Sequence, residues 1–596
     1  MSALSDTTAG PQLEEPPHEP QARPQLRLPA IRISGYAVAV TLLLVLAFVL
    51  RVWGAKHGLP YAYNADENAH FVPHAIGMFV QNGDPGYYVN PAGYTNILYL
   101  VFGLYFGGRE GVSKQFAAHP EEVFLVARVT AAALGTIAVW LLYLAGKRMF
   151  DKRTGLLAAA LLAVSFLPVF YSHLALNDVP TLAPIALSLY GTAGILREGR
   201  IRDYIIAGLG LGIACAFKYT GGIVLLPLAA AIIVQFFAPG GRMPALRGVA
   251  IVGACAFAGF AAANPYALIH FDEFRAGLTH QTEASSDSLG KLGLTQDNGV
   301  GYYLWTFTWG MGWVPLIAGI AGAILLLRDE PRLMAVLAPA PILYVLFMGS
   351  QERFFGRWLL PVFPMVALLA AYCIFELADV VGRKWPPLRL SAIALGTLVL
   401  CGQGLVFSLH IGQVLSRADT RNTTRDWMVA HVPERTKIVV EPIVPDGWAS
   451  DIGHPSLATA NGYRWVKYAA SRSLIDPDTG RALPPPGVVV NIEDYERILR
   501  PSLIDDYEAH GYCYVVTGST QRGRAEAEPN VVPDAIKYYA ELQRRADVAY
   551  QSSPFAEGSK PIGFNFDFSF DYYPLEYRRP GPLITVYRLR GGKCAS

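Results

Sequence analysis

Long runs of apolar residues recur along the chain from about residue 32 to residue 411 and then stop. Many of these runs reach about twenty residues, the length that a helix needs to cross a hydrocarbon core about 30 Å thick. The pattern predicts a polytopic α-helical membrane protein with about eleven spans. We place these spans near residues 33–53, 123–146, 154–173, 180–196, 204–219, 221–237, 248–264, 303–327, 333–349, 357–378 and 390–411.

One apolar run, residues 93–106, does not fit this series. At about fourteen residues it is short for a span. Counting it as a span would also move the basic cluster at Lys147 to the other side of the membrane. We therefore expect interfacial or re-entrant helices in the long loop that follows the first span.

Basic residues predict the orientation, because short cytoplasmic loops carry an excess of Lys and Arg. Placing the five basic loops in the cytoplasm gives consistent crossings, a cytoplasmic N-terminus and an extracytoplasmic C-terminal part. We expect a multi-pass protein of the inner (plasma) membrane. The five loops contain Lys147-Arg148 with Lys152-Arg153; Arg197 with Arg200 and Arg202; Arg242 with Arg247; Arg328 with Arg332; and Arg383-Lys384 with Arg389.

The two ends of the chain differ from its apolar middle. Residues 1–30 are rich in Pro, Glu and Gln, which predicts a disordered cytoplasmic tail. A transmembrane domain is expected over residues 31–413, and an extracytoplasmic soluble α/β domain over residues 414–596. Within that last domain, the predicted strands are residues 437–440, 487–490, 512–516 and 583–587, and the predicted helices are residues 423–430 and 534–550.

Composition supports this division and excludes one class of partner. Hydrophobic residues make up 52% of the chain and charged residues 16%, so a water-soluble fold of this size is not expected. The net charge is +2 without a basic stripe, which argues against nucleic acid. Cys513 and Cys594 are the two cysteines of the C-terminal domain. A disulfide between them would suit an oxidising compartment, and free thiols are the alternative.

Two acidic sites fall at the predicted outer boundary. The first is Asp66-Glu67, soon after the first span and followed by His70. The second is Asp178, just outside the third span. Each could simply cap a helix, because Asp is a favoured N-cap residue. Two carboxylate sites on one face beside a long aromatic loop nevertheless favour a functional role, since charge at a membrane boundary often marks a site.

A third site carries positive charge on the same side. Arg353 and Arg357 lie between the ninth and tenth spans, and a helix would place them on one face. Lys218 falls at the outer end of its own span. Guanidinium groups match phosphate oxygens well. The alternative is that these side chains snorkel to lipid headgroups or pair with Glu352.

Together, the carboxylates and cations predict transfer of a group from a membrane-held phosphate ester. A carboxylate can act as general base on an incoming hydroxyl, and fixed cations or a metal can stabilise charge on the leaving phosphate. No nucleotide-binding glycine motif occurs in the sequence. A lipid-linked donor is therefore simpler than a nucleotide donor.

Residues 33–380 resemble the lipid-carrier-dependent glycosyltransferases of the C superfamily and are similar to protein O-mannosyltransferases and aminoarabinose transferases. The resemblance rests on the Asp66-Glu67 pair, on the Arg128 helix that runs into Lys147-Arg148-Met149-Phe150, on Asp178 and on the Arg353…Arg357…Pro361…Pro364 stretch. It implies inverting transfer of a sugar from a polyprenyl phosphate to an acceptor hydroxyl on a protein, lipid or glycan.

The resemblance also implies residue roles. Asp66 would be the base or its close partner, Asp178 a second carboxylate of the site, and Lys218, Arg353 and Arg357 would hold the donor phosphate. Glu67 and His70 would orient Asp66 or help to ligate a divalent cation, and the need for a metal stays open. The alternatives are a transporter or flippase of lipid-linked sugars and a non-catalytic assembly or sensor protein.

Overall fold

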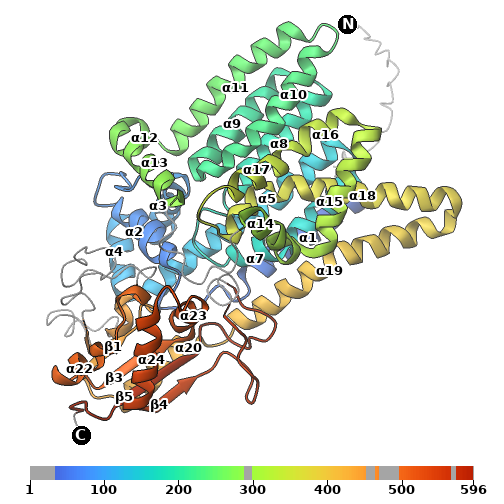
Figure 1. The fold of residues 1–596 in the computed structure, drawn as a ribbon. Helices are drawn as coiled ribbons and strands as arrows, with labels where there is room; N and C mark the ends of the chain where they lie inside the picture. Colours follow the sequence, from blue (N-terminus) through green and yellow to red (C-terminus); the bar gives the residue numbers. More distant parts are fainter. Residues whose placement is uncertain (1–33, 287–297, 451–463, 469–494, 565–571, 595–596) are drawn as a thin grey trace, which may run out of the picture.

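The computed structural model describes residues 34–286, 298–450, 464–468, 495–564 and 572–594. Helices between residues 35 and 415 form one body, and a small sheet with its own helices lies at one end of it (Figure 1). The predicted tail over residues 1–30 and the predicted strand at residues 487–490 lie outside the described residues.

Within the described residues, eight helical segments are long and apolar enough to cross a membrane. Their apolar composition identifies a membrane protein, as the sequence predicts. They are α1 (Gly35–Val52), α5 (Pro120–Met149), η2 and α10 (Tyr219–Phe237), α11 (Arg242–Ala263), α14, η3 and α15 (Gly299–Asp329), α16 and α17 (Pro331–Gly349), η4 and α18 (Gly356–Lys384), and the segment Pro386–His431, which contains α19 (Arg389–Leu415) and α20 (Thr420–His431).

The three other predicted spans correspond to shorter helices, so the total of eleven stays a prediction. They are α6 (Lys152–Val164) with α7 (Phe166–Tyr171), α8 (Leu182–Arg197) and α9 (Ile201–Phe217). Nearly every residue of α6 to α8 is buried, because the longer helices surround them. Arg51 of α1 is buried as well and donates to the carbonyl oxygens of Leu162 and Ala163, at 3.1 and 2.9 Å. It satisfies acceptors that the end of α6 leaves open.

Three of the basic loops lie together at one end of the helical body. Arg148 pairs with Asp203 at 2.8 Å and with Glu198 at 3.1 Å, and Arg197 lies 3.9 Å from Glu330. The loops that follow α5, α8 and α15 therefore share one face, as their predicted common side requires. Which compartment this face meets stays a prediction.

The loop between α1 and α5 contains the π-helix η1 (Glu67–Phe71) and three α-helices, α2 (Val72–Gly77), α3 (Gly93–Phe106) and α4 (Arg109–Ala118). Helix α3 covers the same residues as the short apolar run. It buries Tyr94, Leu98 and Phe102, which are spaced four residues apart, while Leu100 and Leu104 are exposed. One apolar face thus packs on the protein and the other stays open, which suits a helix at the membrane boundary.

The C-terminal part contains a five-stranded mixed sheet of order β2-β1-β3-β5-β4. Strands β1, β2 and β3 are parallel, and β5 is antiparallel to both β3 and β4. The soluble-type α/β fold agrees with the prediction. The strands are β1 (Lys437–Val440), β2 (Val466–Lys467), β3 (Tyr514–Gly518), β4 (Ala546–Ser552) and β5 (Ile584–Leu589).

Alternation along these strands builds a core on each face of the sheet. Ile438, Val516 and Val586 pack with Met428 of α20, whereas Val515 and Tyr587 belong to the core on the opposite face. That opposite core also contains residues of α22 (Ser502–Ala509) and α24 (Pro533–Arg545). Cys513 and Cys594 form a disulfide, which confirms that hypothesis.

The predicted helix over residues 534–550 is wrong at its C-terminal end. Helix α24 stops at Arg545, and the chain continues directly as β4. Residues 546–552 pair with β5 along their length. Over residues 546–550, pairing with β5 therefore overrides the helical spacing of polar and apolar residues in the sequence.

Glu441, at the end of β1, predicts a pH effect on stability. It is buried and accepts from the backbone N–H of Gly518 and the hydroxyl of Tyr539, each at 2.7 Å. Burial raises its pKa from 4.5 to about 8. A carboxyl group with a raised folded-state pKa stabilises the fold fully below its unfolded pKa and loses that contribution as the pH rises toward 8.

We expect the melting temperature of the purified protein to fall between pH 5 and pH 8, and Glu441→Gln to reduce this fall. The glutamine keeps an acceptor oxygen but cannot ionise. Thermal unfolding of both proteins across this range measures the effect. Parallel pH profiles of wild type and variant would contradict it.

Candidate active site

Asp66 and Arg357 form an ion pair between segments far apart in the sequence. Arg357 Nη2 lies 2.7 Å from Asp66 Oδ2. Asp66 makes no capping hydrogen bond; instead Asn64 Oδ1 accepts from the backbone N–H of Glu67 at 3.1 Å. The capping role therefore belongs to Asn64, and the Asp66 carboxylate is available for interactions in the site.

The charge of Asp66 is set by its neighbours. Burial alone would raise the pKa of this carboxyl group, but the positive charge of Arg357 lowers it below its ordinary value, with further lowering from His70 and Lys218. His70 Nε2 lies 3.9 Å from Asp66 Oδ1. Asp66 is thus held as a carboxylate at neutral pH.

Asp178 and Lys218 form the second ion pair, through Asp178 Oδ1 and Lys218 Nζ. Lys218 has an extended backbone that ends α9. The side-chain amide of Asn177 donates to the carbonyl of Phe217 at 2.8 Å, which ties the end of α9 to the loop that carries Asp178. The N-cap position of α8 is Thr181, so Asp178 does not cap this helix.

The two ion pairs belong to one cluster. Lys218 acts electrostatically on Asp66, and Arg357 acts on Lys218, in addition to the direct partners. Two carboxylates and two cations from four separate segments therefore meet in one place. The sequence indicates each of these four residues separately, and the fold brings them together.

Arg353 is related to Arg357 of this cluster through an aromatic ring. The guanidinium carbons of Arg353 and Arg357 lie 5.4 and 4.9 Å from the centre of the Phe355 ring. Residues 353–355 are not helical, and the 3-10 helix η4 begins at Gly356. The expectation that one helix face carries both arginines is therefore wrong, and a shared aromatic ring relates them instead.

Glu67 points away from Asp66 into a buried network. Its oxygens accept from Arg128 Nε at 2.7 Å and from Arg128 Nη2 at 2.8 Å. The backbone N–H of Ala175 donates to the same carboxylate at 2.9 Å. Glu67 and Arg128 are both fully buried. Since its contacts are all internal, we infer that Glu67 positions the Asp66 loop.

His70 and His74 hold the ring of Tyr87 between them. The ring centre of Tyr87 lies 5.0 Å from that of His70 and 4.7 Å from that of His74, with interplanar angles of 9° and 19°. His74 Nδ1 also lies 2.8 Å from the carbonyl oxygen of Pro85. The stack connects the helix after Asp66 to the later part of the same loop, so the position of His70 beside Asp66 depends on Tyr87.

The C-terminal part places Tyr572 next to the site. Tyr572 is buried, and its ring centre lies 4.7 Å from Trp309 and 5.1 Å from Phe170. Its hydroxyl is 3.3 Å from that of Tyr171, whose ring lies 6.0 Å from the guanidinium carbon of Arg357. The C-terminal part thus packs against α7 and η3, and Tyr171 of α7 in turn lies near Arg357.

Sequence reasoning did not find Tyr572 or the positioning role of Arg128. Tyr572 lies more than two hundred residues after Arg357 in an aromatic-rich segment, and nothing in that segment distinguishes it from its neighbour Tyr573. Arg128 is the one charged residue of α5 between its acidic first turn and its basic last turn. A lone arginine within an apolar stretch is the signal that could have assigned it a buried partner.

The side chains around Asp66 decide whether the site could bind a metal ion. In the described ranges, no three or more His, Cys, Asp or Glu side chains are grouped to hold a metal ion. Asp66 and His70 could offer two ligands, but Asp66 is already paired with Arg357. The described side chains do not fit a complete cation site.

Comparisons with known proteins support the resemblance over part of the chain. Residues 120–264 match the family model described as dolichyl-phosphate-mannose-protein mannosyltransferase. This confirms the resemblance to lipid-carrier-dependent glycosyltransferases that the sequence indicated. The match includes Asp178 and Lys218, whereas Asp66 and Arg357 lie outside it. No curated protein matches the sequence significantly.

Several solved structures are distantly similar. The oligosaccharyltransferase of Archaeoglobus fulgidus has 12% identity and a TM-score of 0.49, covering 89% of this chain and 75% of its own. ArnT of Cupriavidus metallidurans has 12% identity and a TM-score of 0.47, covering 94% and 100%. The Pmt1-Pmt2 complex of S. cerevisiae, bound to the sugar donor, has 19% identity and a TM-score of 0.33, covering 41% and 35%. Because these scores are below 0.5, they do not establish a shared fold.

Breaking the buried pair should destabilise the protein strongly. Glu67→Leu leaves the Arg128 charge buried without its carboxylate, which typically costs about 3–5 kcal/mol. Asp379→Asn, which disrupts the half-exposed pair with Arg389, should cost about 1 kcal/mol or less. Chemical denaturation of the purified proteins compares the two. Equal midpoints for both variants would refute the importance of the buried pair.

Removing the inserted ring should also lower stability. Tyr572→Ala leaves a cavity among Trp309, Phe170 and Tyr171, and such truncations cost about 3–5 kcal/mol. Tyr572→Phe keeps the ring and should retain most of the stability. Tyr105→Ala, at an exposed position, is the matched control. If Tyr572→Ala unfolded at the temperature of this control, the inserted ring would not be a structural anchor.

Proposed function

We propose that the protein is a membrane glycosyltransferase that moves a sugar from a polyprenyl-phosphate donor to an acceptor hydroxyl, with inversion at the sugar carbon. The meeting of Asp66, Arg357, Asp178 and Lys218 in one cluster carries this proposal. The family match over residues 120–264 supports the reaction class. The acceptor is a hydroxyl of a protein, lipid or glycan.

In the proposed reaction, Asp66 is the general base. It takes the proton from the acceptor hydroxyl while the hydroxyl oxygen attacks the first carbon of the sugar. The bond from that carbon to the phosphate oxygen breaks, and polyprenyl phosphate leaves with the electron pair. Arg357, Lys218 and Arg353 stabilise the negative charge on the phosphate, because preorganised cations favour the state in which that charge develops.

The Asp66–Arg357 pair suggests how base and donor are linked. Without donor, Arg357 lowers the pKa of Asp66 and makes this carboxylate a weak base. When Arg357 turns to the donor phosphate, Asp66 loses its closest cation and becomes more basic. Donor binding would thereby prepare the base. Asp178 would hold Lys218 in place throughout.

We also propose that this site faces the extracytoplasmic side of the inner membrane, with the C-terminal part on the same side. The positively charged loops that follow α5, α8 and α15 support this orientation, and the Cys513–Cys594 disulfide is suited to an oxidising compartment. A lipid-linked donor can reach that compartment, where nucleotide sugars are scarce.

A transporter or flippase of lipid-linked sugars is the alternative. It would also need cations at the membrane boundary, but it would leave the sugar–phosphate bond intact. Turnover therefore separates the two functions. A transporter would move the lipid-linked sugar across a vesicle membrane without releasing polyprenyl phosphate.

Asp66→Asn should abolish sugar transfer, because an amide cannot accept the proton. The measurement is release of polyprenyl phosphate from a panel of polyprenyl-phosphate sugars by the purified protein. Loss of a general base typically lowers the rate about 10²–10⁴-fold.

Asp178→Asn should weaken donor binding through Lys218 and raise KM more than it lowers kcat.

Glu110→Gln, an exposed carboxylate of α4 in the same loop, is the matched control and should keep full activity. Full activity of Asp66→Asn would show that another group is the base. An absence of release with every donor, together with transport of the intact lipid, would replace the transferase by the transporter.

A further inference from the structure

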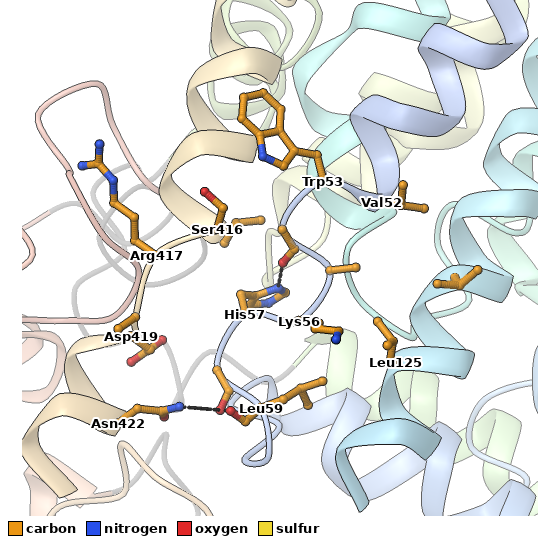
Figure 2. Close-up of a pocket in the computed structure, with 16 residues that line it drawn as sticks. Val52, Trp53, Lys56, His57, Leu59, Leu125, Ser416, Arg417, Asp419 and Asn422 are labelled. Atoms are coloured by element: carbon orange, nitrogen blue, oxygen red, sulfur yellow. Dashed lines mark hydrogen bonds between the residues drawn. The ribbon is translucent and has the colours of Figure 1, made fainter. Parts of the chain in front are cut away.

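A cavity of about 600 Å³ lies where the helical body meets the C-terminal part (Figure 2). It is formed by the end of α1, the loop that follows, the start of α5, the end of α19 and the start of α20. None of the four residues of the two ion pairs lines it. The volume falls in the range of small-ligand sites, about 300–1,000 Å³.

One wall of the cavity is apolar and lies at the edge of the membrane. It is made by Val52 and Trp53 at the end of α1, Leu125 and Val129 in α5, and Leu415 at the end of α19. These helices belong to candidate spans. Trp53 is partly exposed, as is usual for tryptophan at a membrane–water boundary. The apolar wall therefore belongs to helices that we expect to cross the membrane.

Two cations line the cavity. Lys56, from the first loop, lies beside Leu125 of the apolar wall, and Arg417, from the link after α19, lies on the other side of the cavity with its side chain directed away from Lys56 (Figure 2). Arg417 Nη1 donates a hydrogen bond to the carbonyl oxygen of Arg578, at 2.8 Å. Asp419 also lines the cavity, but Arg421 neutralises it with two hydrogen bonds of 2.9 and 2.7 Å. The net charge offered to a ligand is thus positive.

The floor of the cavity connects to the candidate active site. Arg128 Nη1 donates to the carbonyl oxygens of Ala55 and His57, at 2.7 and 2.8 Å. The same guanidinium holds Glu67, the neighbour of Asp66 in the chain. A ligand that orders residues 54–59 would therefore act on the Asp66 loop through one buried side chain.

We propose that this cavity binds an anionic glycerophospholipid of the leaflet on the side of the C-terminal part. The headgroup phosphate lies beside Lys56, Arg417 adds positive charge on the other side of the cavity, and an acyl chain lies against Trp53, Leu125 and Val129. Charge complementarity selects an anionic headgroup over a zwitterionic one. The bound lipid supports the loop that Arg128 joins to Glu67.

Native mass spectrometry of the full-length protein in detergent tests the proposal, with phosphatidylglycerol and phosphatidylcholine as probes. Wild type should retain phosphatidylglycerol preferentially. Lys56→Ala with Arg417→Ala should weaken its binding about tenfold, which corresponds to about 1.4 kcal/mol. Arg109→Ala with Lys114→Ala, which removes two exposed charges from α4, is the matched control and should bind as wild type.

Val129→Trp tests the cavity itself, because it fills the apolar wall without changing charge, and it should also weaken phosphatidylglycerol binding. Equal retention of the two lipids by wild type, or equal loss in the Lys56/Arg417 and control variants, would overturn the proposal. Selective loss of polyprenyl phosphate, but not of phosphatidylglycerol, would assign the cavity to the carrier lipid instead. These binding outcomes do not depend on whether the protein transfers sugar.

Discussion

The buried ion pair between Glu67 and Arg128 is the constraint on which the candidate site depends. A carboxylate and a guanidinium without solvent are stable only when nearly all their hydrogen-bonding groups have partners. Arg128 meets this need by binding Ala55, His57 and Glu67 at once, while Glu67 also accepts from Ala175. One helix thereby fixes the loop after α1 and the segment before Asp178, so the positions of both candidate carboxylates depend on the same guanidinium.

The site itself is electrically balanced before any substrate arrives. Asp66 with Arg357, and Asp178 with Lys218, form two neutral pairs. A phosphate entering this cluster must exchange partners with a carboxylate, because the nearby cations are already engaged. Specificity for the donor phosphate then depends on the difference in free energy between the cation–phosphate pairs that form and the cation–carboxylate pairs that break. The pairing also avoids the cost of leaving isolated charges in a partly buried site.

The sequence predicted the membrane body, the helix over residues 93–106, the C-terminal α/β part and the four residues of the ion-pair cluster. These follow from apolar run length, strand alternation and charge at span ends, all of which are local. Local patterns could not show that Glu67 faces away from Asp66, since both adjacent carboxylates look alike in sequence. The four-residue spacing of Arg353 and Arg357 suggested a shared helix face, although the backbone there is not helical before Gly356. The contact of Tyr572 with Trp309 depends on how the two parts of the chain pack together.

Helix α19 leads from the membrane body to the C-terminal part through only a few residues before α20 begins. Because this connection is short and mostly helical, the length of α19 sets both the orientation of the C-terminal part around the helix axis and its distance from the membrane body. Each residue added within α19 would turn everything beyond it by about 100° around the helix axis and move it about 1.5 Å. Natural variation in the length of this helix should therefore be rare, even though many of its side chains are exposed. The phase of one helix sets which face of the C-terminal part meets the membrane body.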